Sequence, residues 1–185
     1  MSTNGHHLIL GKVTDFISGG SIDDTHDERY RQHLAQLLVE KKGFAKDEIT
    51  PQKEIYACAD ENKAIIRLDF YIMLANRIRM IIKYGPGSLV TRHRPALAIA
   101  RLLALYQIPL VVVTNGEDAD ILAGKSGKVL VSGLARIPSR RELLLQTTDS
   151  KYEPISPKQV EIESRILYAY EVDGSCPCDE TICRL

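Results

Sequence analysis

RLDFYI at residues 67–72 and RIRMIIK at residues 77–83 decide the fold of this chain, because both segments have the apolar and β-branched content of β-strands. A turn near residues 74–76 would make the two strands neighbours. This pairing would place Asp69 on one strand beside Lys83 on the next. In phosphodiester cleavage a carboxylate holds Mg²⁺ and an ammonium group stabilises the attacked phosphate. The two segments therefore predict half of a metal-dependent nuclease site.

The other half of such a site is missing from the second strand. Successive side chains of a strand point to opposite faces, so residue 81 shares a face with Lys83. A carboxylate there would complete the oxygen shell of the metal, but residue 81 is Ile. Asp69 alone would hold Mg²⁺ only weakly without nucleic acid.

Further segments support this interpretation through their order and spacing. They are GKVTDFI at residues 11–17, DTHDERYRQ at 24–32 and PLVVVTNG at 109–116. Together with Arg67 and Asp69 they resemble the N-terminal domain of type I restriction enzyme R subunits, a family of the PD-(D/E)XK nuclease-like superfamily. The resemblance covers roughly residues 8–123, about the size of one small domain.

The resemblance implies an α/β fold, called α+β in some schemes, with a restriction-endonuclease-like core. A central mixed β-sheet would be flanked by helices in the order α-β-β-β-α-β, with extra C-terminal helices. The implied partner is DNA, the cofactor Mg²⁺, and the activity that of a type I restriction-like endodeoxyribonuclease. Asp69 would be the metal-binding acid, Lys83 the active-site lysine, and Glu28 an outer metal ligand from the first helix.

Two departures from the family's pattern predict weakened or absent cleavage. The family's acid before the lysine falls on Ile81, and its helical Gln-x-x-x-Tyr motif falls on Ala98 and Leu102. Losing about 4 kcal/mol of metal activation would slow the reaction roughly thousandfold. The leading prediction is therefore a DNA-binding domain with a degenerate active site. Cleavage would persist only if another acid had moved in, and the candidates are Glu54 on the neighbouring strand, Glu117 and Asp118.

Basic residues gather between residues 77 and 94. The formal net charge is zero, which argues against a general polyanion binder. Between Ala75 and Gly116, however, there is no acidic residue. We expect a phosphate-contacting rim there, formed by Arg77, Arg79, Arg92 and Arg94. The alternative is that these charges only keep a sheet edge and a loop soluble.

Hydrophobic periodicity predicts the remaining elements. A first helix is expected at residues 27–42, opened by a capping box of Thr25 and Glu28. Strands are expected at 54–59, 65–74, 77–84, 108–113, 121–123 and 129–131, a buried helix at 95–106, and short helices after Ser139 and Ser156. We expect a nuclease-like domain at residues 1–135 and a helical extension at 136–185 packed on it.

Three cysteines near the C-terminus, Cys176, Cys178 and Cys183, predict a second function. In a reducing compartment such clusters more often bind a soft metal or cycle redox state than form ordinary disulfides. A closed zinc site needs four nitrogen or sulfur ligands, so the fourth would come from Cys58, His6, His7, His93 or a second chain. The rival prediction is a non-enzymatic structural or interaction protein that binds Zn or Fe through this tail or forms a homodimer with it.

A third alternative leaves no site at all, because Asp69 would be an exposed strand residue paired with Arg67 or Arg79. As for location, no stretch is apolar over the ~18 residues that a membrane helix needs. The start MSTNG also lacks a secretion signal pattern. We therefore expect a cytoplasmic protein.

Overall fold

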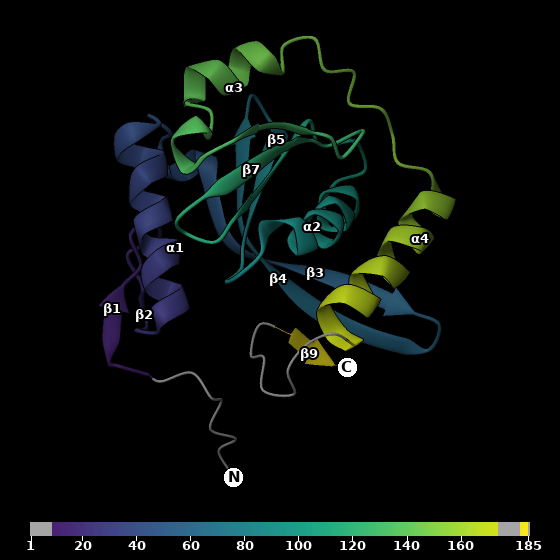
Figure 1. Ribbon diagram of the computed structural model, residues 1–185, viewed down its shortest axis with the longest axis horizontal. Coiled ribbons are helices and arrows are strands. Elements are labelled where there is room, and N and C mark those ends of the chain that lie inside the picture. The colour runs from purple at the N-terminus through teal and green to yellow at the C-terminus, as the bar shows by residue number, and fades with distance from the viewer. Residues whose placement is uncertain (1–8, 174–181, 185) are drawn as a thin grey trace.

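A mixed β-sheet forms the centre of the structure, a computed structural model that describes residues 9–173 and 182–184 (Figure 1). The strands neighbour one another in the order β3-β4-β5-β6-β7-β8, and β9 pairs with β4. β5 and β6 pair in parallel, whereas the other neighbours are antiparallel. The bounds are β3 (Ile49–Ala59), β4 (Asn62–Leu74), β5 (Arg77–Tyr84), β6 (Leu110–Thr114), β7 (Ala119–Ala123), β8 (Val129–Ser132) and β9 (Ile182–Arg184).

Helices flank this sheet in the predicted order. They are α1 (His26–Gln36), α2 (Leu89–Leu103), α3 (Arg140–Gln146) and α4 (Pro157–Tyr168). α1 continues as the π-helical turn η1 (Leu37–Lys41), and α4 continues as η4 (Ala169–Asp173). Smaller elements are the hairpin of β1 (Lys12–Thr14) and β2 (Ser21–Asp23) and the 3-10 turns η2 (Lys46–Glu48) and η3 (Leu134–Arg136). The α/β class is confirmed. Every helix in the described ranges is too short or too polar to span a bilayer.

Two hydrophobic cores lie on opposite faces of the sheet. One contains Ile81 with side chains from α2 and α4, and the other contains Ile82 with side chains from α1 and α3. Figure 1 shows α1 and α4 on opposite sides of the central strands. Because Ile81 and Ile82 are consecutive, their division between the cores is the alternation expected of a strand buried on both faces.

Thr25, Ser139 and Ser156 were expected to cap the starts of helices, and the structure confirms all three caps. Each side chain accepts a hydrogen bond from the backbone N–H three residues later, at Glu28, Glu142 and Gln159 respectively. These bonds satisfy donors that the first helical turn would otherwise leave unpaired. The residues after the C-terminal serines therefore form helices, α3 and α4, as expected.

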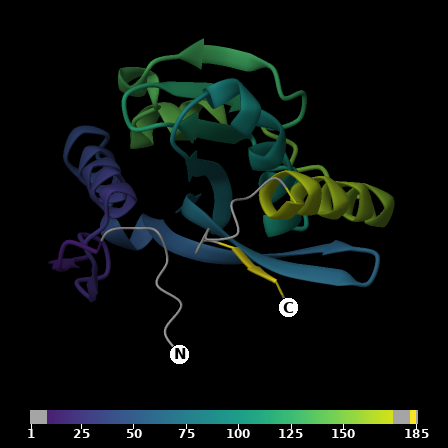
Figure 2. The same ribbon diagram turned by 60° about the horizontal axis from the view of Figure 1, so that its bottom comes forward.

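Several element boundaries differ from the prediction, and two of these differences involve a proline. α2 was expected to start at Pro95, but it begins at Leu89 and runs through this proline. The helix tolerates the backbone hydrogen bond that Pro95 cannot donate, because burial of the following turns offsets the loss. β3 begins at Ile49, before Pro51, because it is an edge strand of the main path and tolerates a missing donor. The β3–β4 hairpin is therefore longer than predicted, and Figure 2 shows α4 lying along it.

A buried carboxylate ties α4 to α2. The Glu163 side chain is 0% exposed, and its oxygens accept hydrogen bonds from Arg94 at 2.5 Å and Arg101 at 2.6 Å. Burial alone would raise the pKa of Glu163, but the two arginine hydrogen bonds outweigh it and lower the pKa below its ordinary value. This clamp fixes the helical extension, expected at residues 136–185, against the core.

Replacing Glu163 should reveal the strength of this clamp. Glu163→Gln leaves two arginines facing a neutral group, so the free energy of unfolding should fall by about 3 kcal/mol in urea denaturation at pH 7. The lowered pKa means that the clamp contributes above pH ~4 and is lost as the pH falls further, so the variant should show a weaker acid dependence. Glu161→Gln is the control, since Glu161 makes an exposed pair with Arg165 at 3.0 Å. Equal losses in both variants would contradict the clamp.

Candidate functional site

Asp69 and Lys83 lie side by side in the interior. The two residues are 5% and 6% exposed, and Lys83 Nζ lies 3.9 Å from Asp69 Oδ2. Antiparallel pairing of β4 with β5 brings them together, since Phe70 is the register partner of Ile82. Ile81 shares the Lys83 strand but is fully buried in the apolar core. The alternative in which Asp69 is an exposed residue does not fit this burial.

The backbone around Asp69 departs from a regular ladder. The pairing of β3 with β4 skips Gln52 and Asp69, and Gln52 has a φ of 49°. Leu68 lies in one core and Phe70 in the other. The Asp69 carboxylate is held at this irregularity by the backbone N–H of Tyr84, which donates to Oδ2 over 2.8 Å. Its position is therefore fixed by β5 as well as by β4.

α1 adds a second acid, Glu28, and a bridging arginine. The Arg31 guanidinium contacts Glu28 closely and lies 3.5 Å from Asp69 Oδ1. Burial would lower the pKa of Arg31, but Asp69 and Glu28 outweigh burial and raise it. The expected capping box is therefore only half formed: Thr25 accepts the Glu28 N–H, while the Glu28 carboxylate accepts from Arg31 and Gln32.

A third acid, Glu171, reaches the same place from the C-terminal turn η4. Its side chain is 5% exposed, Oε2 lies 3.9 Å from Lys83 Nζ, and Oε1 lies 3.9 Å from Arg92 Nη1. Oε1 is buried and accepts no hydrogen bond from any described residue. The sequence interpretation missed this residue. Its helical spacing could have revealed it. Glu171 follows Leu167 by four residues and Tyr168 by three, which places it on the apolar side of the last helix.

Arg92 occupies the more open edge of this group. Its side chain is 36% exposed and lies over Gly85, where an added Cβ would meet Nε at 3.2 Å. Glycine at residue 85 thus leaves room for the guanidinium. With Arg92 the charges balance, because three carboxylates (Glu28, Asp69, Glu171) face three cations (Arg31, Lys83, Arg92). We call these six residues the charged cluster.

Tyr84 closes the cluster on the side of α1. Its hydroxyl donates to Asp27 Oδ1 over 3.2 Å, and its ring stacks on Tyr30 with centroids 5.7 Å apart. Burial, followed by the charge of Asp27, raises the pKa of Tyr84. The phenol therefore stays protonated and acts as a donor that fixes α1 to the end of β5.

A family model of the type I restriction enzyme R protein N terminus matches residues 26–138. This chain belongs to that family. Comparisons with curated proteins and with solved structures gave no match. The segment matched to the R-protein family includes five members of the charged cluster but ends before Glu171. The resemblance drawn from the sequence is thereby confirmed.

The three carboxylates expected to replace the acid missing at residue 81 lie apart from the charged cluster. Glu54 faces Arg67 across the β3–β4 pair at 3.7 Å, with both side chains about half exposed. Glu117 and Asp118 belong to the turn after β6, where both backbone N–H groups donate to Asn115 Oδ1. The structure brings none of these three carboxylates into contact with Asp69 or Lys83 among the residues it describes.

Of the four arginines expected to contact DNA, three have other contacts. Arg77 stacks over Tyr106 at the start of β5, about 20 Å along the strand from Lys83. Arg79 donates to Thr147, and Arg94 is bound to Glu163. Arg92 is the predicted arginine that joins the charged cluster.

The cysteine hypothesis falls mostly outside the described residues. This applies to Cys176 and Cys178, as to His6 and His7, while the backbone of Cys183 pairs with Ile65 in the β4–β9 ladder. Within the described ranges no group of three or more His, Cys, Asp or Glu side chains is arranged to hold a metal. The Zn or Fe site therefore stays a prediction, as does the homodimer.

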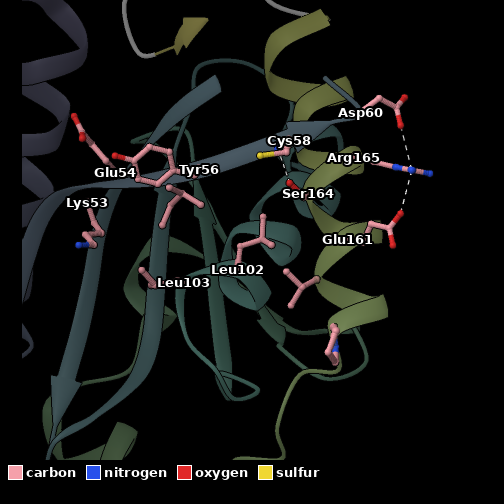
Figure 3. A pocket seen from close by; sticks show the side chains of 13 residues that line it. Lys53, Glu54, Tyr56, Cys58, Asp60, Leu102, Leu103, Glu161, Ser164 and Arg165 are labelled. Carbon is pink, nitrogen blue, oxygen red and sulfur yellow. Dashed lines mark hydrogen bonds and ion pairs between the residues drawn. The ribbon is translucent and has the colours of Figure 1, made fainter. Parts of the chain in front are cut away.

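Cys58 lines a groove between β3 and α4 (Figure 3). The groove has a volume of about 710 Å³, and its walls include Tyr56, Leu102 and Ser164. The Cys58 backbone N–H donates to Ser164 Oγ over 2.5 Å, which joins the strand to the helix. Three of the charged residues drawn there, Asp60, Glu161 and Arg165, pair at its outer edge. The groove therefore shows helix–strand packing rather than a group of reactive side chains.

A double-mutant cycle should measure the Asp69–Lys83 interaction. Asp69→Asn and Lys83→Met should each lower the free energy of unfolding by about 2 kcal/mol, because each leaves a buried charge uncompensated. The double variant should lose less than the sum, with a coupling of about 1 to 3 kcal/mol in urea denaturation. The exposed Glu54–Arg67 pair, tested as Glu54→Gln and Arg67→Met, should couple by well under 1 kcal/mol. Additive losses at Asp69 and Lys83 would mean that the two charges do not interact.

Proposed function

We propose that this domain binds DNA at the charged cluster and is a Mg²⁺-dependent endodeoxyribonuclease of weakened activity. The observation that carries the proposal is the buried pairing of Asp69 with Lys83 at 3.9 Å, in a chain of the type I restriction R-protein N-terminal family. An acid and a lysine on adjacent strands are the groups that phosphodiester chemistry needs in one place.

The residues of the cluster differ in what they offer to DNA. Arg92 is the more accessible cation, so it would contact a backbone phosphate first. Lys83 lies deeper and would face the phosphate under attack, because its ammonium is in ion-pair range of both Asp69 and Glu171. Neutralising the phosphate's charge at a water-poor site is worth more than the same contact at the surface.

Asp69 is the residue best placed to hold Mg²⁺. The hydrogen bond from the Tyr84 N–H orients its carboxylate, and oxygen ligands suit a hard divalent cation. When bound, the ion would supply charge neutralisation and activation of a water molecule. The donor set fits Mg²⁺, which is usually held by one or two carboxylates together with substrate phosphates.

Weak activity follows from the apolar residue at position 81. Ile81 is fully buried among core side chains, so it cannot supply an oxygen on the Lys83 strand. A deficit of about 4 kcal/mol in barrier lowering corresponds to a roughly thousandfold slower reaction. Slow nicking together with measurable DNA affinity is therefore the expected phenotype.

DNA binding should depend on Arg92 and not on Arg77. In fluorescence anisotropy with a labelled duplex in EDTA, Arg92→Ala should weaken binding several-fold and make the slope of log K against log salt shallower by about 0.9. Arg77→Ala is the matched control, because its guanidinium stacks on Tyr106 at the far end of β5. Equal effects of the two variants would mean that DNA binds away from the charged cluster. Salt-independent binding, or no binding at all, would contradict the proposal.

Strand cleavage should require the paired charges. Supercoiled plasmid incubated with Mg²⁺ or Mn²⁺ should be nicked slowly by the unchanged protein, and Asp69→Ala or Lys83→Ala should reduce nicking at least tenfold, since each removes a group in contact with the reacting phosphate or its ion. Glu54→Gln should leave the rate unchanged. Nicking that persists in Asp69→Ala and Lys83→Ala would be assigned to a contaminating nuclease.

A further inference from the structure

We infer that Glu171, from the turn that follows α4, is the second metal-binding carboxylate of the site. The inference rests on the proposed metal-dependent function and adds a ligand that lies outside the segment matched to the family. Mg²⁺ held by Asp69 alone would lack a second protein carboxylate, because the Ile81 side chain supplies no oxygen. Glu171 brings a carboxylate to the same ammonium group from another part of the chain.

Two distances define the convergence. Asp69 Oδ2 and Glu171 Oε2 each lie 3.9 Å from Lys83 Nζ, so the two carboxylates converge on the same ammonium group. Both side chains are 5% exposed. Two buried carboxylates close to one point supply the negative charge and the oxygen ligands that a divalent ion prefers.

An unpaired oxygen supplies independent support. Glu171 Oε1 is buried, and no described residue donates a hydrogen bond to it; the nearest cation is Arg92, at 3.9 Å. A buried carboxylate oxygen without a donor is unfavourable, and such atoms call for a ligand or a function. A divalent cation would satisfy this oxygen without any further hydrogen-bond donor.

Glu163 shows how a purely structural carboxylate looks in the same helical segment. Its oxygens accept from Arg94 and Arg101 at 2.5 and 2.6 Å, which are full hydrogen-bonding distances. The Glu171 carboxylate, by contrast, lies 3.9 Å from both Lys83 Nζ and Arg92 Nη1. A carboxylate whose task was only to pair these cations would be expected to hydrogen bond them as Glu163 does. The looser arrangement leaves its oxygens available.

The surrounding packing fixes the Glu171 backbone. Leu167, Tyr168 and Val172 are buried in the core that also contains Ile81. α4 packs against α2 and β3, and the Glu163 clamp joins it to α2. The turn that carries Glu171 is therefore supported on both sides, as a metal ligand needs to be.

Mn²⁺ titration of the full chain, by isothermal calorimetry and by the loss of the free Mn²⁺ signal in electron paramagnetic resonance, tests the inference. Glu171→Gln should weaken Mn²⁺ binding at least tenfold, to a similar degree as Asp69→Asn, because each removes one charged ligand. Glu171→Asp keeps the charge and should bind with intermediate affinity. Glu161→Gln, an exposed acid on α4, is the matched control and should bind like the unchanged chain.

The outcomes separate the inference from the function on which it rests. If Asp69→Asn loses Mn²⁺ and Glu171→Gln does not, Glu171 is no ligand while the proposed function stands. The inference also fails if Glu171→Gln keeps its Mn²⁺ affinity and binds duplex DNA more tightly in EDTA, since Glu171 would then be shielding Lys83 and Arg92. Absence of Mn²⁺ binding in the unchanged chain would overturn both. Circular dichroism and thermal unfolding check that each variant is folded, and Glu171→Asp serves if the Gln variant is not.

Discussion

Balance among buried charges is the constraint on which the rest of this structure depends. Lys83 lies at the end of a central strand with almost no access to water, where a lone ammonium group would be strongly unfavourable. Its compensation comes from separate elements, with Asp69 on β4 and Glu171 on η4 in ion-pair range of the ammonium. Those two acids in turn meet Arg31 of α1 and Arg92 of α2. Each element must therefore dock correctly for the charges of the others to be satisfied, which couples both faces of the sheet.

Local patterns in the sequence were sufficient for most of this architecture. The apolar and β-branched content of residues 77–84 predicted a strand, and the hydroxyl caps at Thr25, Ser139 and Ser156 marked three helix starts. The errors came where tertiary context overrides a local rule. The strand was expected from residue 54 and the helix from Pro95, yet an edge strand that contains Pro51 and a well-packed helix that contains Pro95 each tolerate a proline.

The candidate site was predictable only where it depends on local strand pairing. Asp69 and Lys83 follow from strand pairing, which depends on nearby residues, whereas Glu28 was expected from the family resemblance. Glu171 depends on where a C-terminal helix packs, and sequence spacing carries no direct information on that docking. Glu54 was the natural substitute because it lies on a neighbouring strand, but its side chain is paired with Arg67 at the surface. Proximity along a sheet is thus a weaker guide than burial of the charge itself.

The position of Glu171 beyond the family-matched segment has a consequence for how such domains can be exchanged between proteins. A cut after residue 138 would retain Lys83 and Arg92 but discard the acid that faces both, together with the apolar side of α4 that covers the sheet. The remaining fragment would keep three cations of the charged cluster beside only two carboxylates, and the apolar face of the sheet under α4 would be uncovered. Recombination at that boundary would therefore yield a poorly folding chimera, and inheritance of the two parts as one block is the arrangement that preserves a stable domain.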